Sequence, residues 1–152
     1  MKVLILKLFI FALNVAYLPF KLLKTSKKVV MISRQSNEVN DDFNLLGDEL
    51  IKKGYKVKYL CRTLDGGVNS SLFTKIGYGF HMFTQMYHLA TSEICVLDTY
   101  CLVVSILKHK KNLKIVQIWH SIGTLKQFGW QILHRKEGSN PVIAKTLKMH
   151  QN

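Results

Sequence analysis

The run Gln117-Ile-Trp-His-Ser-Ile-Gly-Thr-Leu-Lys-Gln-Phe-Gly129 holds the residue best suited to chemistry, His120. An imidazole titrates near pH 6.5, so it can take or give a proton at neutral pH. The apolar stretch from Leu113 to Trp119 predicts a buried strand that ends beside His120, and ligands of open α/β sheets bind at the carboxyl ends of strands. His120 is therefore a candidate for proton transfer. A hydrogen-bonded structural histidine beside Trp119 is the alternative.

Polar side chains also follow two other predicted strands, 29–33 and 94–97. They are Arg34, Gln35 and Ser36 after the first strand, and Asp98, Thr99 and Tyr100 after the second. In a parallel sheet all carboxyl strand ends lie at one edge, so we expect these groups on the same rim as His120. Asp98 could orient a substrate hydroxyl or the His120 ring, or it could cap the helix that follows.

The loop after His120 has a composition suited to an anion. Ser121 and Gly123 are small, so backbone N–H groups could face a phosphate, and Lys126 adds a positive charge. Taken alone, Lys126 would be interpreted as a solvated surface lysine.

The segments that must position these residues alternate between strand and helix. We expect strands at 29–33, 56–61, 94–97 and 113–119, and helices at 41–53, from Asn69 or Ser70 to about Leu89, and at 100–107. Gly54 should end the first of these helices, and the lysines that alternate through 56–61 favour a strand near a sheet edge. This order predicts an α/β fold with a Rossmann-like parallel sheet, in a chain whose 152 residues suit one domain.

The net charge of +13 is concentrated at the two ends of the chain. Residues 1–28 contain six lysines and no acid, and residues 108–152 contain nine basic residues against one glutamate. Such a surplus implies an anionic partner: nucleic acid, anionic lipid or a phosphate-rich substrate. Nucleic acid ranks last, because basic residues flank apolar segments and no RNA-binding signature is present.

The cysteines and two of the histidines indicate neither zinc nor redox chemistry. Cys61, Cys95 and Cys101 form no Cys-x-x-Cys pair, so buried reduced thiols and a domain facing the cytoplasm are expected. His81 and His88 lie seven residues apart on one helical face among apolar neighbours, with no third ligand. We therefore predict no metal and no cofactor.

The amino-terminal segment 1–24 is an apolar helix with lysines at both ends. Three interpretations compete: a helix that lies in or marginally spans an anionic membrane surface, a cleaved signal peptide, and a helix docked on the domain itself. The first is favoured, because lysines at both ends can reach lipid head groups.

The motif around His120 resembles the Gln-x-Trp-His-(Gly/Ala)-x-Gly-x-x-Lys-x-Phe-Gly signature of the CDP-glycerol glycerophosphotransferases, enzymes of teichoic acid synthesis. Segments 32–38, with Asp42 and Phe43, and 90–100 resemble that family's first and third strands, so the resemblance covers about 29–149. Ser121 departs from the pattern, since many members carry Gly or Ala there.

The resemblance implies transfer of glycerol phosphate from the substrate CDP-glycerol to a lipid-linked acceptor in cell-wall polymer synthesis, at the cytoplasmic face of the membrane. His120 then matches the catalytic position, as general base, and substrate is expected to contact Arg34, Gln35, Ser36, Asp98, Tyr100, Ser121, Gly123 and Lys126.

Members of this family have a two-domain GT-B-like architecture, so the resemblance implies that this chain corresponds to the amino-terminal half. Residues 28–137 would form the acceptor-side domain, and 138–152 would begin a continuation toward a carboxyl-terminal nucleotide-binding domain. A truncated, non-catalytic membrane-associated module that needs a second domain is the alternative, and a transferase that uses a different nucleotide-activated alcohol is another.

Overall fold

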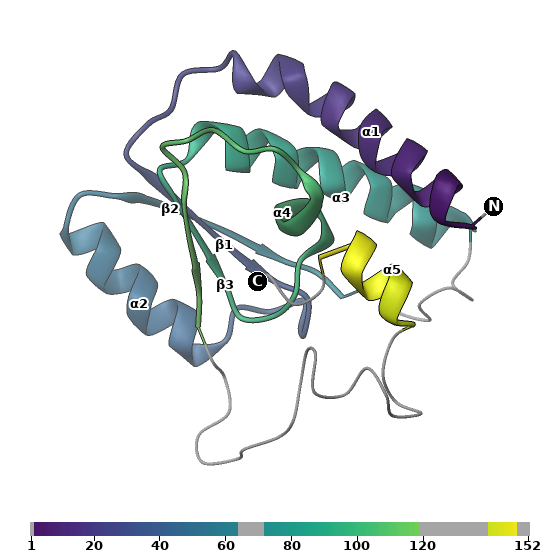
Figure 1. Ribbon diagram of the computed structural model, residues 1–152. Helices are drawn as coiled ribbons and strands as arrows, with labels where there is room; N and C mark the ends of the chain where they lie inside the picture. Colours follow the sequence, from purple (N-terminus) through teal and green to yellow (C-terminus); the bar gives the residue numbers. More distant parts are fainter. Residues whose placement is uncertain (1, 64–71, 119–139, 149–152) are drawn as a thin grey trace.

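The computed structural model describes residues 2–63, 72–118 and 140–148 (Figure 1). Within them, four parallel strands form one sheet in the order β2-β1-β3-β4. The strands are β1 (Lys28–Ser33), β2 (Lys56–Cys61), β3 (Ile94–Leu97) and β4 (Lys114–Gln117). This arrangement confirms the predicted Rossmann-like parallel sheet, with β2 at an edge as expected.

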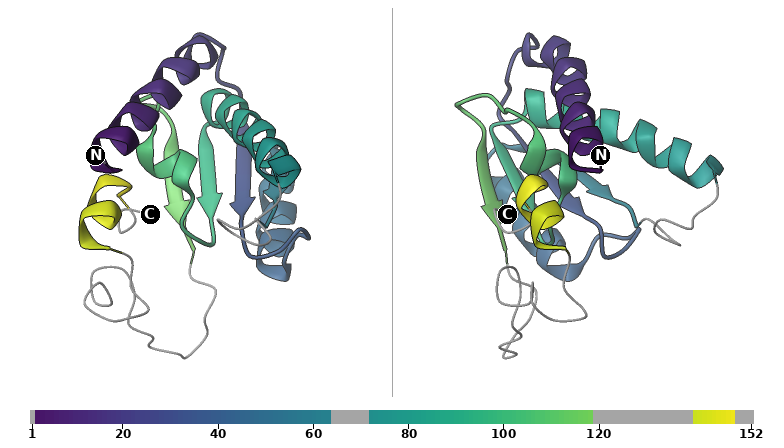
Figure 2. Two further views of the ribbon diagram at one scale, coloured as in Figure 1. Left: turned by 90° about the vertical axis from the view of Figure 1, so that its right-hand side faces the viewer. Right: turned by 45° about the vertical axis from the view of Figure 1, so that its right-hand side comes forward.

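Helices cover both faces of the sheet (Figures 1 and 2). They are α1 (Lys2–Lys21), α2 (Asp41–Lys52), α3 (Leu72–Thr91), α4 (Leu102–Ile106) and α5 (Pro141–Thr146). The α2 helix packs on one face, whereas α3 and α4 pack on the other, with α1 against α3. The structure therefore has helices on each side of the sheet, as crossover connections between parallel strands require.

The central strand β1 supplies both hydrophobic cores through its alternation. Val30 and Ile32 join the core on the α3 side, while Val29 and Met31 join the core on the α2 side with the fully buried Phe43. No disulfide joins the three cysteines: Cys95 and Cys101 are buried, and Cys61 is partly buried.

Local signals fix the α2 helix where the sequence predicts it. The Asn40 side chain caps its start by accepting a hydrogen bond from the Phe43 N–H at 2.8 Å. Gly54 follows its end with φ of 80°, a left-handed conformation that favours glycine. On its inner face Gly47 leaves space for the Tyr59 hydroxyl, which would lie 1.8 Å from an added Cβ.

One expectation about the later elements is confirmed with narrower bounds, and one is wrong. The helix expected at 100–107 is shorter, Leu102–Ile106, and β4 is not a buried strand. Ile115 and Val116 are 43% and 46% exposed, and among the described strands β4 lies at the end of the sheet and pairs with β3. The apolar run alone cannot show this, since an edge position depends on sheet order.

The α1 helix is docked on the domain, which was one of the three interpretations of the amino-terminal segment. Tyr17 is only 1% exposed within the core, and the Asn14 side-chain amide donates to the Ile106 carbonyl at 3.1 Å. The Asn14 oxygen accepts a hydrogen bond from the Lys108 N–H at 2.8 Å. The opposite face of α1 exposes large apolar side chains: Leu4, Ile5, Leu8, Phe11, Val15 and Leu18.

The docking of α1 predicts unequal effects of two aromatic substitutions on that helix. Tyr17→Ala should lower the free energy of unfolding by about 3–5 kcal/mol, because it removes a fully buried ring. Phe11→Ala, at a side chain that is 68% exposed, should change it by roughly 0.5 kcal/mol or less. Urea unfolding in detergent-free buffer measures both, and equal destabilisation would contradict the docked geometry.

Candidate functional site at the carboxyl edge of the sheet

The carboxyl ends of the four described strands lie at one edge of the sheet (Figure 2). The loop after β1 begins at this edge with Arg34, Gln35 and Ser36, and the loop after β3 contains Asp98 and Tyr100. The Ile118 N–H donates to the Leu97 carbonyl at 2.8 Å, so the pairing of β4 extends to this edge. His120, Ser121, Gly123 and Lys126 follow Ile118 in the sequence and lie outside the described residues.

Arg34 and Tyr100 come together across the edge. The Arg34 Nη1 donates to the Tyr100 carbonyl at 3.2 Å, which joins the loops after β1 and β3. The Tyr100 hydroxyl donates to the Leu147 carbonyl at 2.8 Å, and burial raises the pKa of Tyr100 to about 12. Tyr100 is therefore a neutral donor that links the edge to the end of α5.

Asp98 is held from the α2 side of the sheet. Its Oδ2 accepts from the Asn40 side-chain amide at 3.2 Å, and its Oδ1 accepts from the Thr99 hydroxyl at 3.0 Å. Because Asn40 also caps α2, the Asp98 carboxylate is tied to the start of that helix. The alternative role of Asp98 as a cap for the following helix is wrong: α4 is preceded by Cys101, without a side-chain capping bond.

Gln35 and Ser36 shape the loop after β1. The Gln35 N–H donates to the Ser33 Oγ at 3.2 Å, and the Glu38 N–H donates to the Ser36 Oγ at 2.8 Å. These short-range bonds order the turn that leads to α2. Substrate contact by either side chain stays a prediction.

Three residues on the α3 side of the same edge were not predicted to belong to the site: Arg62, Tyr78 and His81, the last of which was considered only as a metal ligand. Arg62 follows β2 as Arg34 follows β1, and its Nη1 donates to the Gly77 carbonyl at 3.2 Å. Tyr78 and His81 of α3 lie next to these arginines, with their ring centroids 5.9 Å apart. Arg62 could have been found by the strand-end rule, whereas the positions of Tyr78 and His81 depend on how α3 packs.

The two α3 histidines have different surroundings. The His88 Nδ1 lies 3.2 Å from the Lys28 ammonium nitrogen, which itself contacts Thr91. Burial first, then the nearby charges of Lys28 and Lys58, lower the pKa of His88 to about 4. In the described parts of the chain, no group of three His, Cys, Asp or Glu side chains is placed to hold a metal ion.

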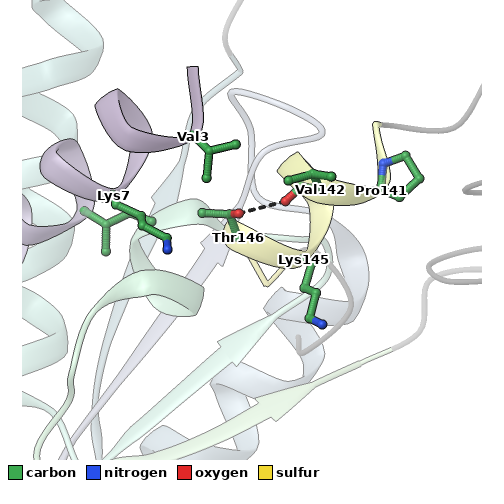
Figure 3. A pocket seen from close by; sticks show the side chains of 7 residues that line it. Val3, Lys7, Pro141, Val142, Lys145 and Thr146 are labelled. Atoms are coloured by element: carbon green, nitrogen blue, oxygen red, sulfur yellow. Dashed lines mark hydrogen bonds between the residues drawn. The ribbon is translucent and has the colours of Figure 1, made fainter. Parts of the chain in front are cut away.

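A groove lies between α1 and α5 (Figure 3). Its volume is about 670 Å³, and its walls are Val3, Lys7 and Ile10 from α1 and Pro141, Val142, Lys145 and Thr146 from α5. The α1 stretch Val3–Lys21 is long and apolar enough to cross a membrane by length and composition. Apolar surface and lysines thus occur together on this side of the molecule.

The fold and edge define an α/β protein of the kind that binds ligands at the carboxyl ends of parallel strands. The family described as CDP-Glycerol:Poly(glycerophosphate) glycerophosphotransferase matches residues 15–152. The chain therefore belongs to this family of phosphotransferase-type enzymes, as the motif around His120 predicts.

Individual relatives match shorter stretches. The teichoic acid ribitol-phosphate primase of Bacillus spizizenii is 29% identical over 126 residues, which cover 82% of this chain and 31% of the primase. The teichoic acid poly(ribitol-phosphate) polymerase of the same organism is 30% identical over 129 residues, which cover 83% of this chain and 20% of the polymerase. The teichoic acid glycerol-phosphate primase of Bacillus subtilis is 28% identical over 72 residues, or 47% of this chain and 19% of that protein. The chain thus spans about a third or less of these relatives.

The surroundings of His88 predict a measurable pH dependence. The folded state should resist protonation of His88 until about pH 4, whereas the unfolded state takes up this proton near pH 6.5. The His88 contribution therefore makes the protein less stable as the pH falls from about 6.5 to about 4. NMR titration of the ring should give the low pKa, and Lys28→Met should raise it. A His88 pKa near 6.5 in the unaltered protein would contradict this.

Proposed function

We propose that this chain supplies the acceptor side of a transferase that moves glycerol phosphate from CDP-glycerol to a lipid-linked acceptor in teichoic acid or related polymer synthesis. The family match over residues 15–152 carries this proposal, because it includes the His120 motif and the strand that leads to it. The edge occupied by Arg34, Asp98 and Tyr100 supports it, since polar groups from separate loops converge there.

In the proposed reaction an acceptor hydroxyl oxygen attacks the glycerol-bearing phosphorus of CDP-glycerol. The bond from that phosphorus to the bridging oxygen breaks, and CMP leaves. His120 takes the hydroxyl proton as general base, while the Ser121–Gly123 backbone and Lys126 offset phosphate charge. Positioning contributes most in such a transfer, because the protein does little covalent work.

The groups at the described edge would then bind and orient the acceptor. Arg34 is fixed by the Tyr100 carbonyl, and Asp98 is fixed by Asn40, so each presents a defined direction to a bound polyol. Gln35 and Ser36 belong to the loop between β1 and α2, directly after Arg34. Held side chains of this kind restrict the reacting hydroxyl to few orientations.

A second candidate is transfer of ribitol phosphate from the corresponding nucleotide-activated donor. It is favoured by one observation: the two relatives that match 82% and 83% of this chain are named as ribitol-phosphate enzymes. The same edge and the same base would serve either polyol. The two donors must therefore be compared directly.

We also propose that the protein lies on the cytoplasmic face of the membrane, with α1 in the plane of the interface. A spanning orientation of α1 would break the Asn14 bonds and expose the Tyr17 contact with the core. A helix that lies flat keeps these contacts and places Leu8, Phe11 and Leu18 in the acyl boundary. Lys7, Lys21 and Lys24 would then contact anionic head groups.

The activity is tested by release of CMP with a lipid-linked acceptor and either CDP-glycerol or CDP-ribitol. Because the chain covers 31% of the primase, the assay uses residues 1–152 both alone and with the remaining part of that relative joined after Asn152. His120→Ala should lower turnover by roughly 10²- to 10⁴-fold while folding stays intact. Near-normal turnover of His120→Ala would contradict the assigned base, and no CMP release in any combination would favour a non-catalytic module.

The interfacial orientation is tested by three substitutions on the outer face of α1. Leu8→Gln, Phe11→Gln and Leu18→Gln together should weaken sedimentation with phosphatidylglycerol vesicles by about tenfold or more, through lost apolar burial. The matched control substitutes exposed Leu45, Ile51 and Phe80 by Gln on other helices and should bind normally. Equal loss in both triple variants would contradict a specific role for α1.

A further inference from the structure

Arg34 and Arg62 directly follow the adjacent parallel strands β1 and β2. Ser33 pairs with Cys61 in register, and the Arg62 N–H donates to the Ser33 carbonyl at 3.1 Å, so Arg34 and Arg62 are neighbours just beyond the paired residues. Ile32 and Leu60 belong to the core on the α3 side. Since side chains alternate along a strand, Arg34 and Arg62 point to this same face, above that core.

No carboxylate neutralises this pair in the described part of the chain. The ion pair found there, Lys52 with Glu49, lies on the exposed surface of α2. Arg34 and Arg62 each donate to a carbonyl, which satisfies one N–H but supplies no negative charge. The Arg34 Nε is buried without a hydrogen-bond partner. Like charges in neighbouring loops repel each other, so a bound anion would stabilise this arrangement.

The α3 helix adds further donors over the same arginines. Tyr78, His81 and Gln85 are three and four residues apart, so they share the helix face that meets the sheet. The Tyr78 ring lies close to Arg34: burial raises the pKa of Tyr78, and the nearby Arg34 charge opposes that rise. The His81 Nε2 and the Gln85 Nε2 are buried without partners, and the whole Gln85 residue is 0% exposed.

The helix leaves room for the second guanidinium. Gly77 has no side chain where Arg62 approaches: an added Cβ would lie 3.1 Å from the Arg62 Nη2. An added Cβ at Gly79 would meet nothing within 4 Å.

Burial first, and then the charge of Arg62, lower the pKa of His81 below its usual value. At neutral pH the His81 ring is therefore uncharged and can offer an N–H as a further donor.

We propose that Arg34, Arg62, Tyr78 and His81 form a binding site for a phosphate group on the α3 side of the carboxyl edge. Two guanidinium groups match the oxygens of a phosphate, and the neutral donors of Tyr78 and His81 complete its hydrogen bonding. The site takes a phosphate monoester or diester. The inference rests on the proposed function only for the source of that phosphate, which we assign to the polyol-phosphate end of the acceptor.

The test measures equilibrium binding to residues 1–152, so it does not depend on turnover. Isothermal titration at constant ionic strength compares sn-glycerol 3-phosphate, inorganic phosphate and CDP-glycerol, with glycerol as the uncharged control. We expect the phosphates to bind and glycerol not to bind. Tighter binding of sn-glycerol 3-phosphate than of CDP-glycerol supports the acceptor as source, whereas the reverse order overturns that assignment and leaves the phosphate site in place.

Arg62→Gln should weaken phosphate binding by about tenfold or more, because it removes a guanidinium group that can donate two charge-assisted hydrogen bonds to a phosphate. Lys56→Gln is the matched control, because it removes the same charge from an exposed position at the other end of β2. Unchanged binding in Arg62→Gln, or equal loss in Lys56→Gln, would overturn the site. So would the absence of phosphate binding by the unaltered chain.

If Arg62→Gln does not fold, titration of His81 in the unaltered chain tests the phosphate site. In the unaltered chain, phosphate should raise the pKa of His81, because a neighbouring anion favours the charged imidazole. The ¹⁵N resonances of the His81 ring report this directly, with the His88 ring as internal reference. A His81 titration that phosphate does not move would overturn the inference, since a purely structural role for the arginines predicts that result.

Discussion

Parallel pairing on both sides of β1 is the constraint on which the rest of the structure depends. Because β1 lies between β2 and β3 and is buried on both faces, its register fixes where each neighbouring strand ends. The loops after Ser33, Cys61 and Leu97 must therefore leave the sheet together. Polar groups that are far apart in sequence, such as Arg34 and Tyr100, then meet through a single hydrogen bond. The packing of the buried strand residues thus determines which polar loop residues come together at the carboxyl edge of the sheet.

The sequence predicts the elements whose signals are local. The bounds of β2 and β3 match their expected ranges, and α2 begins at Asp41 and ends just before Gly54, close to the expected range 41–53. The exposure of β4 could not be predicted, because an apolar run is compatible with either a central or an edge strand. The docking of α1 also depends on tertiary contacts: Asn14 interrupts an apolar run, but its partners near Ile106 are 92 residues away.

The same distinction holds for the candidate site. Residues directly after strands were identifiable, because the rule for parallel sheets needs only the strand ends. That rule also covers Arg62, which directly follows β2. The sequence could not predict that α3 contributes side chains to the site, because Tyr78 and His81 lie in a helix rich in aromatic and apolar residues, which is typical of core packing. Their relation to the arginines follows from the packing of α3 on the sheet. His120, Ser121, Gly123 and Lys126 stay predictions that rest on the motif.

The positions of the acidic residues determine how charge is distributed over the molecule. The chain has 9 acidic residues against 22 basic ones, and most acids lie in or near α2. Asp41 and Asp42 occupy the first turn of that helix, where they complement its dipole, and Glu49 pairs with Lys52. Asp98 is bound to Asn40 at the start of the same helix. Asp41, Asp42 and Glu49 thus have structural roles in α2, while no ion pair joins Arg34 or Arg62 to a carboxylate among the described residues. The two guanidinium charges lie on adjacent loops at that side of the edge, and this concentration of positive charge is the physical basis of the phosphate site proposed there.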